Sequence, residues 1–178
     1  MEESTLKYWK DAGHVARRTL EAMKLELTPG KTFHEVIESA ERYIHRHGGK
    51  PAFPGTIAVN DLAAHFTTDH NINSVEGWDG EMVLQKGDCV KIDFGVHIKG
   101  HIADNALTFE IGNGNEHTEQ IKAAKEARDA AIEMLHPGTP WYKVGQAAAQ
   151  PSLDAGFQPI RNLCGHQLKP WELHAGVS

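Results

Sequence analysis

The hydrophobic pattern of the first fifty residues predicts two amphipathic helices. Between residues 4 and 26, apolar side chains recur at helical spacing, and Thr28-Pro29-Gly30 ends that segment. Thr32-Phe33-His34-Glu35 then forms a capping-box pattern, and Gly48-Gly49 closes the helix that follows it. The two apolar stripes consist of Leu6, Trp9, Val15, Ala16, Leu20 and Met23, and of Val36, Ile37, Ala40, Tyr43 and Ile44.

Further along the chain, the pattern predicts shorter elements and two more helices. A short strand is expected around residues 57–59, and the polar, glycine-containing segment 69–81 is typical of a surface loop. Apolar spacing then predicts helices over residues 117–135 and about 140–154. Pro151 falls inside the last of these, so we expect it to kink or shorten that helix.

The sequence also repeats weakly at a shift of 108 residues. The matching pairs are Leu27 and Leu135, Pro29 and Pro137, Gly30 and Gly138, Val36 and Val144, Ala40 and Ala148, Gly48 and Gly156, and Pro51 and Pro159. Chance is the alternative explanation, because Pro and Gly mark helix ends in every protein. We interpret residues 1–178 as one domain, with a complete N-terminal half at about 1–112 and a partial C-terminal half at about 113–178.

One segment, "KIDFGVHIKGHIADNALTFEI", has the composition of a buried hairpin but carries two carboxylates. With Lys99-Gly100 as a two-residue turn, Ile92 opposes Leu107 and Val90 opposes Phe109, which gives one apolar face. Asp93 then opposes Ala106, and Asp93 and Asp104 are diagonal neighbours on the other face. Such neighbours have Cβ atoms roughly 7–8 Å apart or slightly less, so the carboxylates can converge.

Two explanations account for this pair. Converging carboxylates repel unless a proton or cation neutralises them, and the small residues Gly95 and Ala106 leave room over the hairpin. One divalent metal ion or two would satisfy the pair. The alternative is that both Asp side chains face solvent on a one-sided sheet, although Ile102 and Ala103 beside Asp104 favour a covered site.

Three of the twelve histidines could join the carboxylates. His65, His166 and His174 follow apolar residues in turn-like segments, and the alternative for each is a hydrogen-bonded structural histidine. The other nine are interpreted as lying on polar helix faces or loops, without chemistry.

Composition excludes several classes of protein. The chain has 178 residues, 40% hydrophobic and 24% charged, which suits one globular domain, and its net charge of −6 argues against a general nucleic-acid binder. Cys89 and Cys164 are expected to be buried thiols of a reducing compartment. The charged N-terminus does not resemble a signal peptide and no apolar run is long enough for a membrane span, so a cytoplasmic protein is expected.

Several blocks together resemble type 2 methionine aminopeptidase, closest to the archaeal forms. The blocks are "KPAFP", "VNDLAAHFT", "GDCVKIDFGVHIKGHIADNALTF" and "GFQPIRNLCGHQLKPWELHAGVS", and the resemblance runs in order from about residue 5 to residue 178. The "AAH" block and "NLCGH…LHAG" favour type 2 over type 1 and over the related proline dipeptidases.

The resemblance implies an α+β pita-bread fold with two pseudosymmetric halves and a centre of two divalent ions, for which Co, Mn, Fe and Zn are candidates. By position, Asp93 would chelate one ion, Asp104 would bridge both, and His166 would bind the second. His65 and His174 would contact the substrate and the reacting peptide group. The implied reaction removes the initiator methionine of nascent proteins when the next residue is small, by a protein that is monomeric when intact.

Three departures from the family pattern limit what we expect of this chain. The family has two further glutamates, for which the residues up to Ser178 offer no match, since Glu172 lies within the histidine block. His101 stands where the family usually has an aromatic residue, and Pro151 interrupts a helix that the family keeps continuous. We therefore expect little or no activity from this chain alone.

Three questions stay open at this point. The sequence could come from an incomplete reading frame, from an excised part of a full enzyme, or from a short protein that a second chain completes. A non-catalytic pita-bread protein that binds RNA or protein partners is one alternative function, although every ligand position within the chain is retained. An X-Pro dipeptidase is the other.

Overall fold

The computed structural model describes residues 3–67, 82–112 and 114–176, and the chain divides into two compact units. The first unit consists of Met1–Gly114 and His166–Ser178, and the second consists of Asn115–Gly165. The predicted loop at 69–81 lies outside the described residues. No helix within the described ranges is long and apolar enough to cross a membrane.

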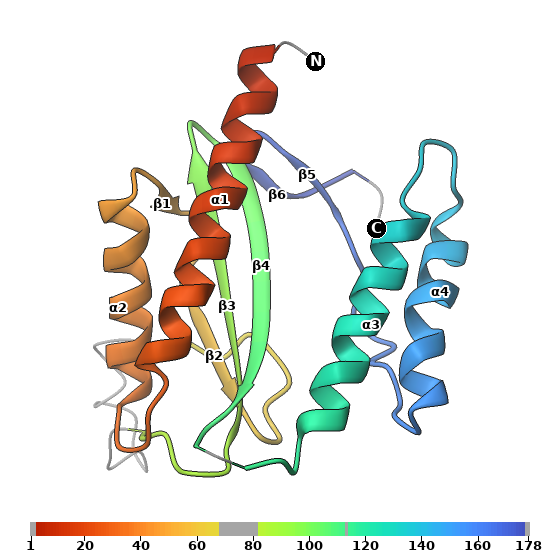
Figure 1. Ribbon diagram of the computed structural model, residues 1–178. Helices are drawn as coiled ribbons and strands as arrows, with labels where there is room; N and C mark the ends of the chain where they lie inside the picture. The colour runs from red at the N-terminus through yellow and green to blue at the C-terminus, as the bar shows by residue number, and fades with distance from the viewer. Residues whose placement is uncertain (1–2, 68–81, 113, 177–178) are drawn as a thin grey trace. The chain divides into compact units, whose positions relative to one another are not determined.

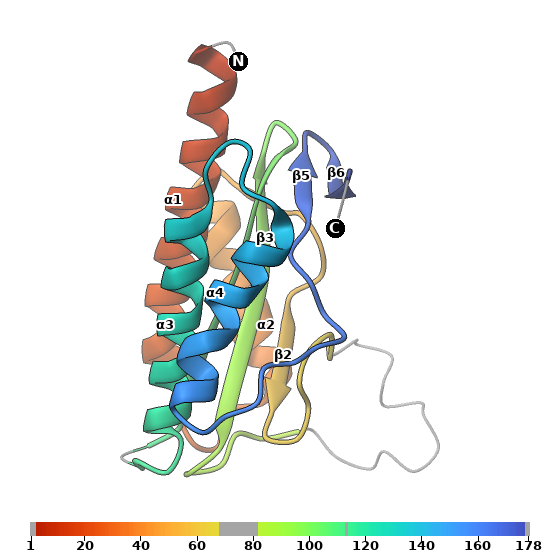
Figure 2. The same cartoon turned by 90° about the vertical axis from the view of Figure 1, so that its right-hand side faces the viewer.

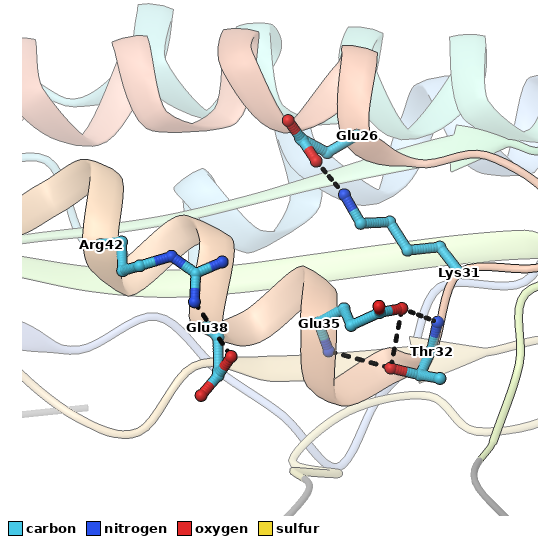
Figure 3. A network of polar contacts seen from close by, with 6 residues as sticks. All are labelled: Glu26, Lys31, Thr32, Glu35, Glu38 and Arg42. Carbon is cyan, nitrogen blue, oxygen red and sulfur yellow. Dashed lines mark hydrogen bonds and ion pairs between the residues drawn. The ribbon is translucent and has the colours of Figure 1, made fainter.

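The first unit begins with the two predicted helices, α1 (Glu3–Glu26) and α2 (Phe33–Arg46). The capping box of α2 is formed as predicted: the Glu35 amide donates to Thr32 Oγ1 at 3.1 Å, and the Thr32 amide donates to Glu35 Oε2 at 2.8 Å. Figure 3 shows this cap beside the ion pair of Lys31 and Glu26, which ties the start of α2 to the end of α1. The loop between the helices is therefore anchored from both sides.

A four-stranded antiparallel sheet follows. It contains β1 (Lys50–Pro51), β2 (Thr56–Val59), β3 (Cys89–Ile98) and β4 (His101–Glu110). Both β1 and β2 pair with β3, and β4 pairs with it as the second arm of the hairpin. The predicted register is confirmed by the pairs Val90 with Phe109, Ile92 with Leu107, Asp93 with Ala106, and Ile98 with His101.

The hairpin turn consists of Lys99 and Gly100, with φ angles of 50° and 83°. Positive φ at both central residues is the geometry of the two-residue turn that matches strand twist. Because this turn sets the register, it also decides which face every hairpin side chain occupies.

The core lies between the sheet and the first two helices. Val90, Ile92, Phe94 and Val96 of β3 are fully buried on the face against which α1 and α2 pack (Figure 1). The opposite face of β3 and β4 is not covered by α1 and α2. A small hairpin, β5 (Gln167–Lys169) and β6 (Glu172–Ala175), lies on that side, away from α1 (Figure 2).

The second unit is a pair of helices, α3 (Thr118–Met134) and α4 (Trp141–Asp154), as predicted. We expected Pro151 to kink or shorten α4, and the shortening is wrong, since the helix continues through Pro151 to Asp154. Pro151 lies in the last turns, so only one backbone hydrogen bond is lost there. Helix α2 runs from Phe33 to Arg46, and α4 runs from Trp141 to Asp154. Both ends are thus shifted by 108 residues, which agrees with the predicted repeat.

Candidate metal centre

Asp93 on β3 and Asp104 on β4 lie on the face of the hairpin opposite the helix-covered core. Asp93 pairs with Ala106 and Asp104 pairs with Gly95, so the two carboxylates are diagonal neighbours, as the sequence predicted. Burial raises the pKa of both carboxyls, and the negative charge of Asp104 raises the pKa of Asp93 further. Asp93 is partly buried and has an oxygen without a partner, whereas Asp104 is exposed, so the alternative of a freely hydrated aspartate fits Asp104 better than Asp93.

The three candidate histidines come from separate segments and lie near Asp104. His65 lies in the loop after β2, His166 directly precedes β5, and His174 lies on β6. His166, His174 and His65 each lower the pKa of Asp104, although burial outweighs them. The three histidines are thus near enough to Asp104 to influence its charge, and Asp93 is its diagonal neighbour on the hairpin.

Two of the histidines are in close contact with one another and with the hairpin. His166 Nε2 lies 3.4 Å from Asp104 Oδ2, and the rings of His166 and His174 meet edge to face with centroids 4.5 Å apart. His166 is partly buried, whereas His174 is exposed. His174 is therefore open to a molecule that approaches from solvent, while His166 is held against the carboxylate.

The His65 loop is held by backbone contacts. His65 has a φ of 62°, a conformation that few non-glycine residues adopt. The Lys91 ammonium donates to the Ala63 carbonyl, and the Ile57 amide donates to the Phe66 carbonyl at 2.8 Å, on either side of the histidine. This conformation is therefore imposed by the loop's attachment to β2 and β3.

Some buried polar atoms at the site have no partner. Among the described residues, Asp93 Oδ1, His166 Nδ1 and Thr56 Oγ1 are buried without a hydrogen bond. Thr56 on β2 pairs with Asp93, so its hydroxyl lies beside the carboxylates, which the sequence gave no reason to expect. A buried polar group without a hydrogen bond lowers the stability of the folded protein by about 1–3 kcal/mol. Three such atoms near the carboxylates therefore indicate a place for a polar ligand.

The space over Gly95 is filled by protein, which corrects the expectation that it was left open. A Cβ at Gly95 would overlap the ring of Phe53, and Ala52 Cβ lies next to it. Phe53 thus lies against the strand position that pairs with Asp104. Sequence reasoning missed Phe53, although the absence of a side chain at Gly95 was the signal that something packs there.

Two further expectations are wrong. His101 is not on a polar loop: it is only 9% exposed, and its ring lies 5.3 Å from those of both Tyr8 and Trp9. Cys164 is exposed and Cys89 is partly buried, so they are not a pair of buried thiols. His101 belongs to the packing of α1 on the hairpin and not to the site.

The donor set fits a divalent cation in part. Two ligands of one ion, each about 2.0–2.2 Å from it, lie roughly 3.0–3.5 Å apart, and the 3.4 Å between His166 Nε2 and Asp104 Oδ2 agrees with that spacing. Carboxylate oxygens and imidazole nitrogens suit manganese, iron, cobalt and zinc. Within residues 3–67, 82–112 and 114–176, however, no three His, Cys, Asp or Glu side chains are close enough to form a metal site by themselves.

Comparison with known proteins gives a consistent result. The profile of metallopeptidase family M24 matches residues 7–177. The methionine aminopeptidase of Thermococcus onnurineus is 38% identical over 167 residues, which are 94% of this chain and 53% of that protein. The methionine aminopeptidase of Methanothermus fervidus is 34% identical over 187 residues, which are 99% of this chain and 93% of that protein.

The fold is shared with solved structures. The crystal structure of methionine aminopeptidase from Thermotoga maritima superimposes with a TM-score of 0.86 at 25% identity, over 99% of this chain and 70% of that one. The expected α+β pita-bread fold is therefore confirmed. The chain spans about half the length of the first curated relatives that it matches. By sequence and by fold, this chain belongs to metallopeptidase family M24.

Proposed function

We propose that this chain carries one half of the active site of a type 2 methionine aminopeptidase, which removes initiator methionine from nascent proteins with a small second residue. The observation that carries the proposal is the convergence of Asp93, Asp104 and His166 on one face of the sheet, with unpartnered buried atoms on Asp93 and His166. Relatives named methionine aminopeptidase support the choice of reaction.

Each residue has a proposed role in this reaction. Asp93, Asp104 and His166 would hold two divalent cations, which when bound supply an activated water near neutral pH. His174, exposed beside His166, would donate a hydrogen bond to the scissile carbonyl as negative charge develops on its oxygen, and His65 would contact the substrate. Phe53, packed over Gly95, offers an apolar surface to the methionine side chain.

We infer that the site is incomplete in this chain alone. The family resemblance implies two glutamate ligands that have no counterpart up to Ser178, and the described residues form no group of three close donors. A dinuclear centre needs ligands that fix both ions, so the isolated chain should bind metal weakly and release little or no methionine.

A chimera tests the function directly. Residues 1–176 are joined to the part of the Thermococcus onnurineus methionine aminopeptidase that follows its matched region, and metal-dependent release of methionine from Met-Ala-Ser is measured. We expect the chimera to be active and its Asp104→Asn variant to be inactive. Asp129→Asn is the control, because Asp129 is an exposed carboxylate on α3.

Two results would count against the proposal. A folded chimera that binds metal but leaves Met-Ala-Ser intact would exclude the reaction. Cleavage of Met-Pro in preference to Met-Ala-Ser would favour the X-Pro dipeptidase alternative. Release of methionine by the unfused chain, in turn, would contradict the inference that its site is incomplete.

A further inference from the structure

Trp171 occupies a position that is unfavourable for a tryptophan. It follows Pro170 in the turn between β5 and β6, with a φ of 64°, where such turns prefer glycine or asparagine. The residue is 73% exposed, although indole is largely apolar. A residue that is strained in its backbone and exposed in its side chain needs a compensating contact.

That contact is with the turn of the carboxylate hairpin. The Trp171 amide donates a hydrogen bond to the Gly100 carbonyl at 2.8 Å. The indole lies directly on Gly100, where a Cβ would overlap its Cε2 and Nε1 atoms. The ring also packs on His97 of β3, with centroids 5.0 Å apart. Gly100 is thus required both for its φ of 83° and for the approach of the indole.

The contact lies at one end of the β5–β6 hairpin, and the candidate site lies at the other. His166 directly precedes β5 and meets Asp104 through its Nε2 atom at 3.4 Å. His174 is on β6, three residues after Trp171. Since β5 and β6 have only three and four residues, a shift at the turn would be passed to both histidines.

We propose that Trp171 is a positioning residue: by clamping its indole and amide on Gly100, it holds the β5–β6 hairpin so that His166 and His174 face Asp104. The effect on metal binding rests on the proposed metal-centre function. The contact of Trp171 with Gly100 does not depend on that function, because it involves protein groups alone. It explains why a left-handed turn position carries an exposed aromatic side chain in place of glycine.

The first test follows the clamp without metal. Hydrogen–deuterium exchange over residues 167–175 is measured in chelator for the wild type, Trp171→Gly, Trp171→Phe and Trp141→Ala. Trp171→Gly relieves the positive φ but removes the ring, so exchange in this segment should become faster while the melting temperature of the chain stays near the wild-type value. Trp171→Phe should restore protection, and Trp141→Ala, at a half-exposed tryptophan of α4, should leave the segment unchanged. Equal exchange in Trp171→Gly and the wild type would overturn the clamp.

The second test measures the consequence for the site. Cobalt(II) affinity is determined by calorimetry, and the visible absorption of bound cobalt reports its ligand geometry. We expect Trp171→Gly to weaken cobalt binding by about 10-fold or more and to alter the absorption spectrum, because loss of a group that orients metal ligands has this effect. Trp171→Phe should restore the affinity and the spectrum. Trp141→Ala should bind like the wild type.

The outcomes separate the two proposals. If Asp104→Asn abolishes cobalt binding and Trp171→Gly leaves it unchanged, the positioning role is wrong and the metal centre stands. If the wild type binds no cobalt even at concentrations that would reveal the weak binding expected of an incomplete site, or if Asp104→Asn binds as well as the wild type, the metal centre is wrong and the positioning role is overturned with it. In that case the hydrogen–deuterium exchange of residues 167–175 alone decides whether Trp171 holds the hairpin on Gly100.

Discussion

His166 and Asp104 are far apart in the chain, yet His166 Nε2 lies 3.4 Å from Asp104 Oδ2. The histidine directly precedes β5 and the carboxylate is in the middle of β4, so the contact joins the small hairpin to the large one. Burial raises the pKa of Asp104 in spite of the nearby histidines, which means that the protein does not fully compensate its charge. A cation bound at this contact would compensate it.

Added metal should therefore stabilise the first unit. A ligand that binds only the folded state at 100 times its dissociation constant adds about 2.7 kcal/mol to the free energy of unfolding. We expect cobalt(II) or manganese(II) to raise the melting temperature of the wild type, EDTA to reverse the increase, and Asp104→Asn to abolish it. An equal increase in Asp104→Asn would mean that the ion binds elsewhere.

Removal of the charge of Asp93 should stabilise the metal-free protein. Burial and the charge of Asp104 raise the pKa of Asp93 in the folded state, so the ionised carboxylate is less stable there than in the unfolded chain. The protonated Asp93 carboxyl therefore favours the folded state at acidic pH, and this stabilisation is lost as the pH rises through the folded-state pKa of Asp93. Asp93→Asn should therefore raise the free energy of unfolding by about 1 kcal/mol at neutral pH in EDTA, on the scale of other stabilising substitutions.

Denaturant titration across pH checks this prediction. The gain from Asp93→Asn should shrink as the pH falls below the carboxyl pKa, because the wild-type side chain is then neutral too. Asp129→Asn is the control, since Asp129 is exposed and such surface changes stay within about 0.5 kcal/mol. An Asp93→Asn protein that is less stable than the wild type at neutral pH would refute the account of this carboxylate.

Gly95 should tolerate no side chain while Phe53 packs on it. Gly95→Ala places a methyl group in the Phe53 ring, and such overpacking typically costs about 1–3 kcal/mol. Phe53→Ala should relieve the clash, so the double variant is expected to lose less stability than the two single variants together. Gly13→Ala is the matched control, because nothing lies within 4 Å of a Cβ at Gly13 and the residue is inside α1. Additive losses in the double variant would show that Phe53 does not limit this position.

The capping box of α2 should make stability depend on pH in the opposite sense to Asp93. The Thr32 backbone and side chain hold the pKa of Glu35 below its usual value, so its stabilising effect is present at neutral pH and is lost as the pH falls through the folded pKa. Thr32→Ala should cost about 1 kcal/mol at neutral pH. Glu35→Gln should be less stable than the wild type at neutral pH, and the two should converge in acid. A constant difference at all pH values would contradict the role of the Glu35 charge.

The strands and their register were predictable because local signals agreed. Alternating apolar residues define the buried face of β3, and Lys99-Gly100 suits a two-residue turn, so the opposition of Asp93 and Ala106 followed. That register also placed His101 opposite Ile98, on the core face, and this was the signal that it is buried. Its burial against Tyr8 and Trp9 was missed because the contact depends on how α1 crosses the hairpin, which no local pattern gives.

The surroundings of the carboxylates were predictable only in part. The candidate ligands were recognised from residue type and family resemblance, but Phe53 and Thr56 approach from separate segments. Thr56 is placed by the pairing of β2 with β3, and no spacing within the sequence predicts that pairing. The turn that brings Trp171 onto Gly100 was likewise hidden, because Pro170-Trp171 lacks the glycine that such turns prefer.

The central claim is that Asp104 and His166 hold a divalent cation. Crystals of the protein soaked in cobalt(II) and measured at the cobalt absorption edge test it most directly, because anomalous scattering locates the ion without assumptions about its ligands. We predict a peak within about 2.0–2.3 Å of a carboxylate oxygen of Asp104 and a ring nitrogen of His166, and no such peak in Asp104→Asn. A cobalt peak at other residues, with none beside Asp104 in the wild type, would contradict the account.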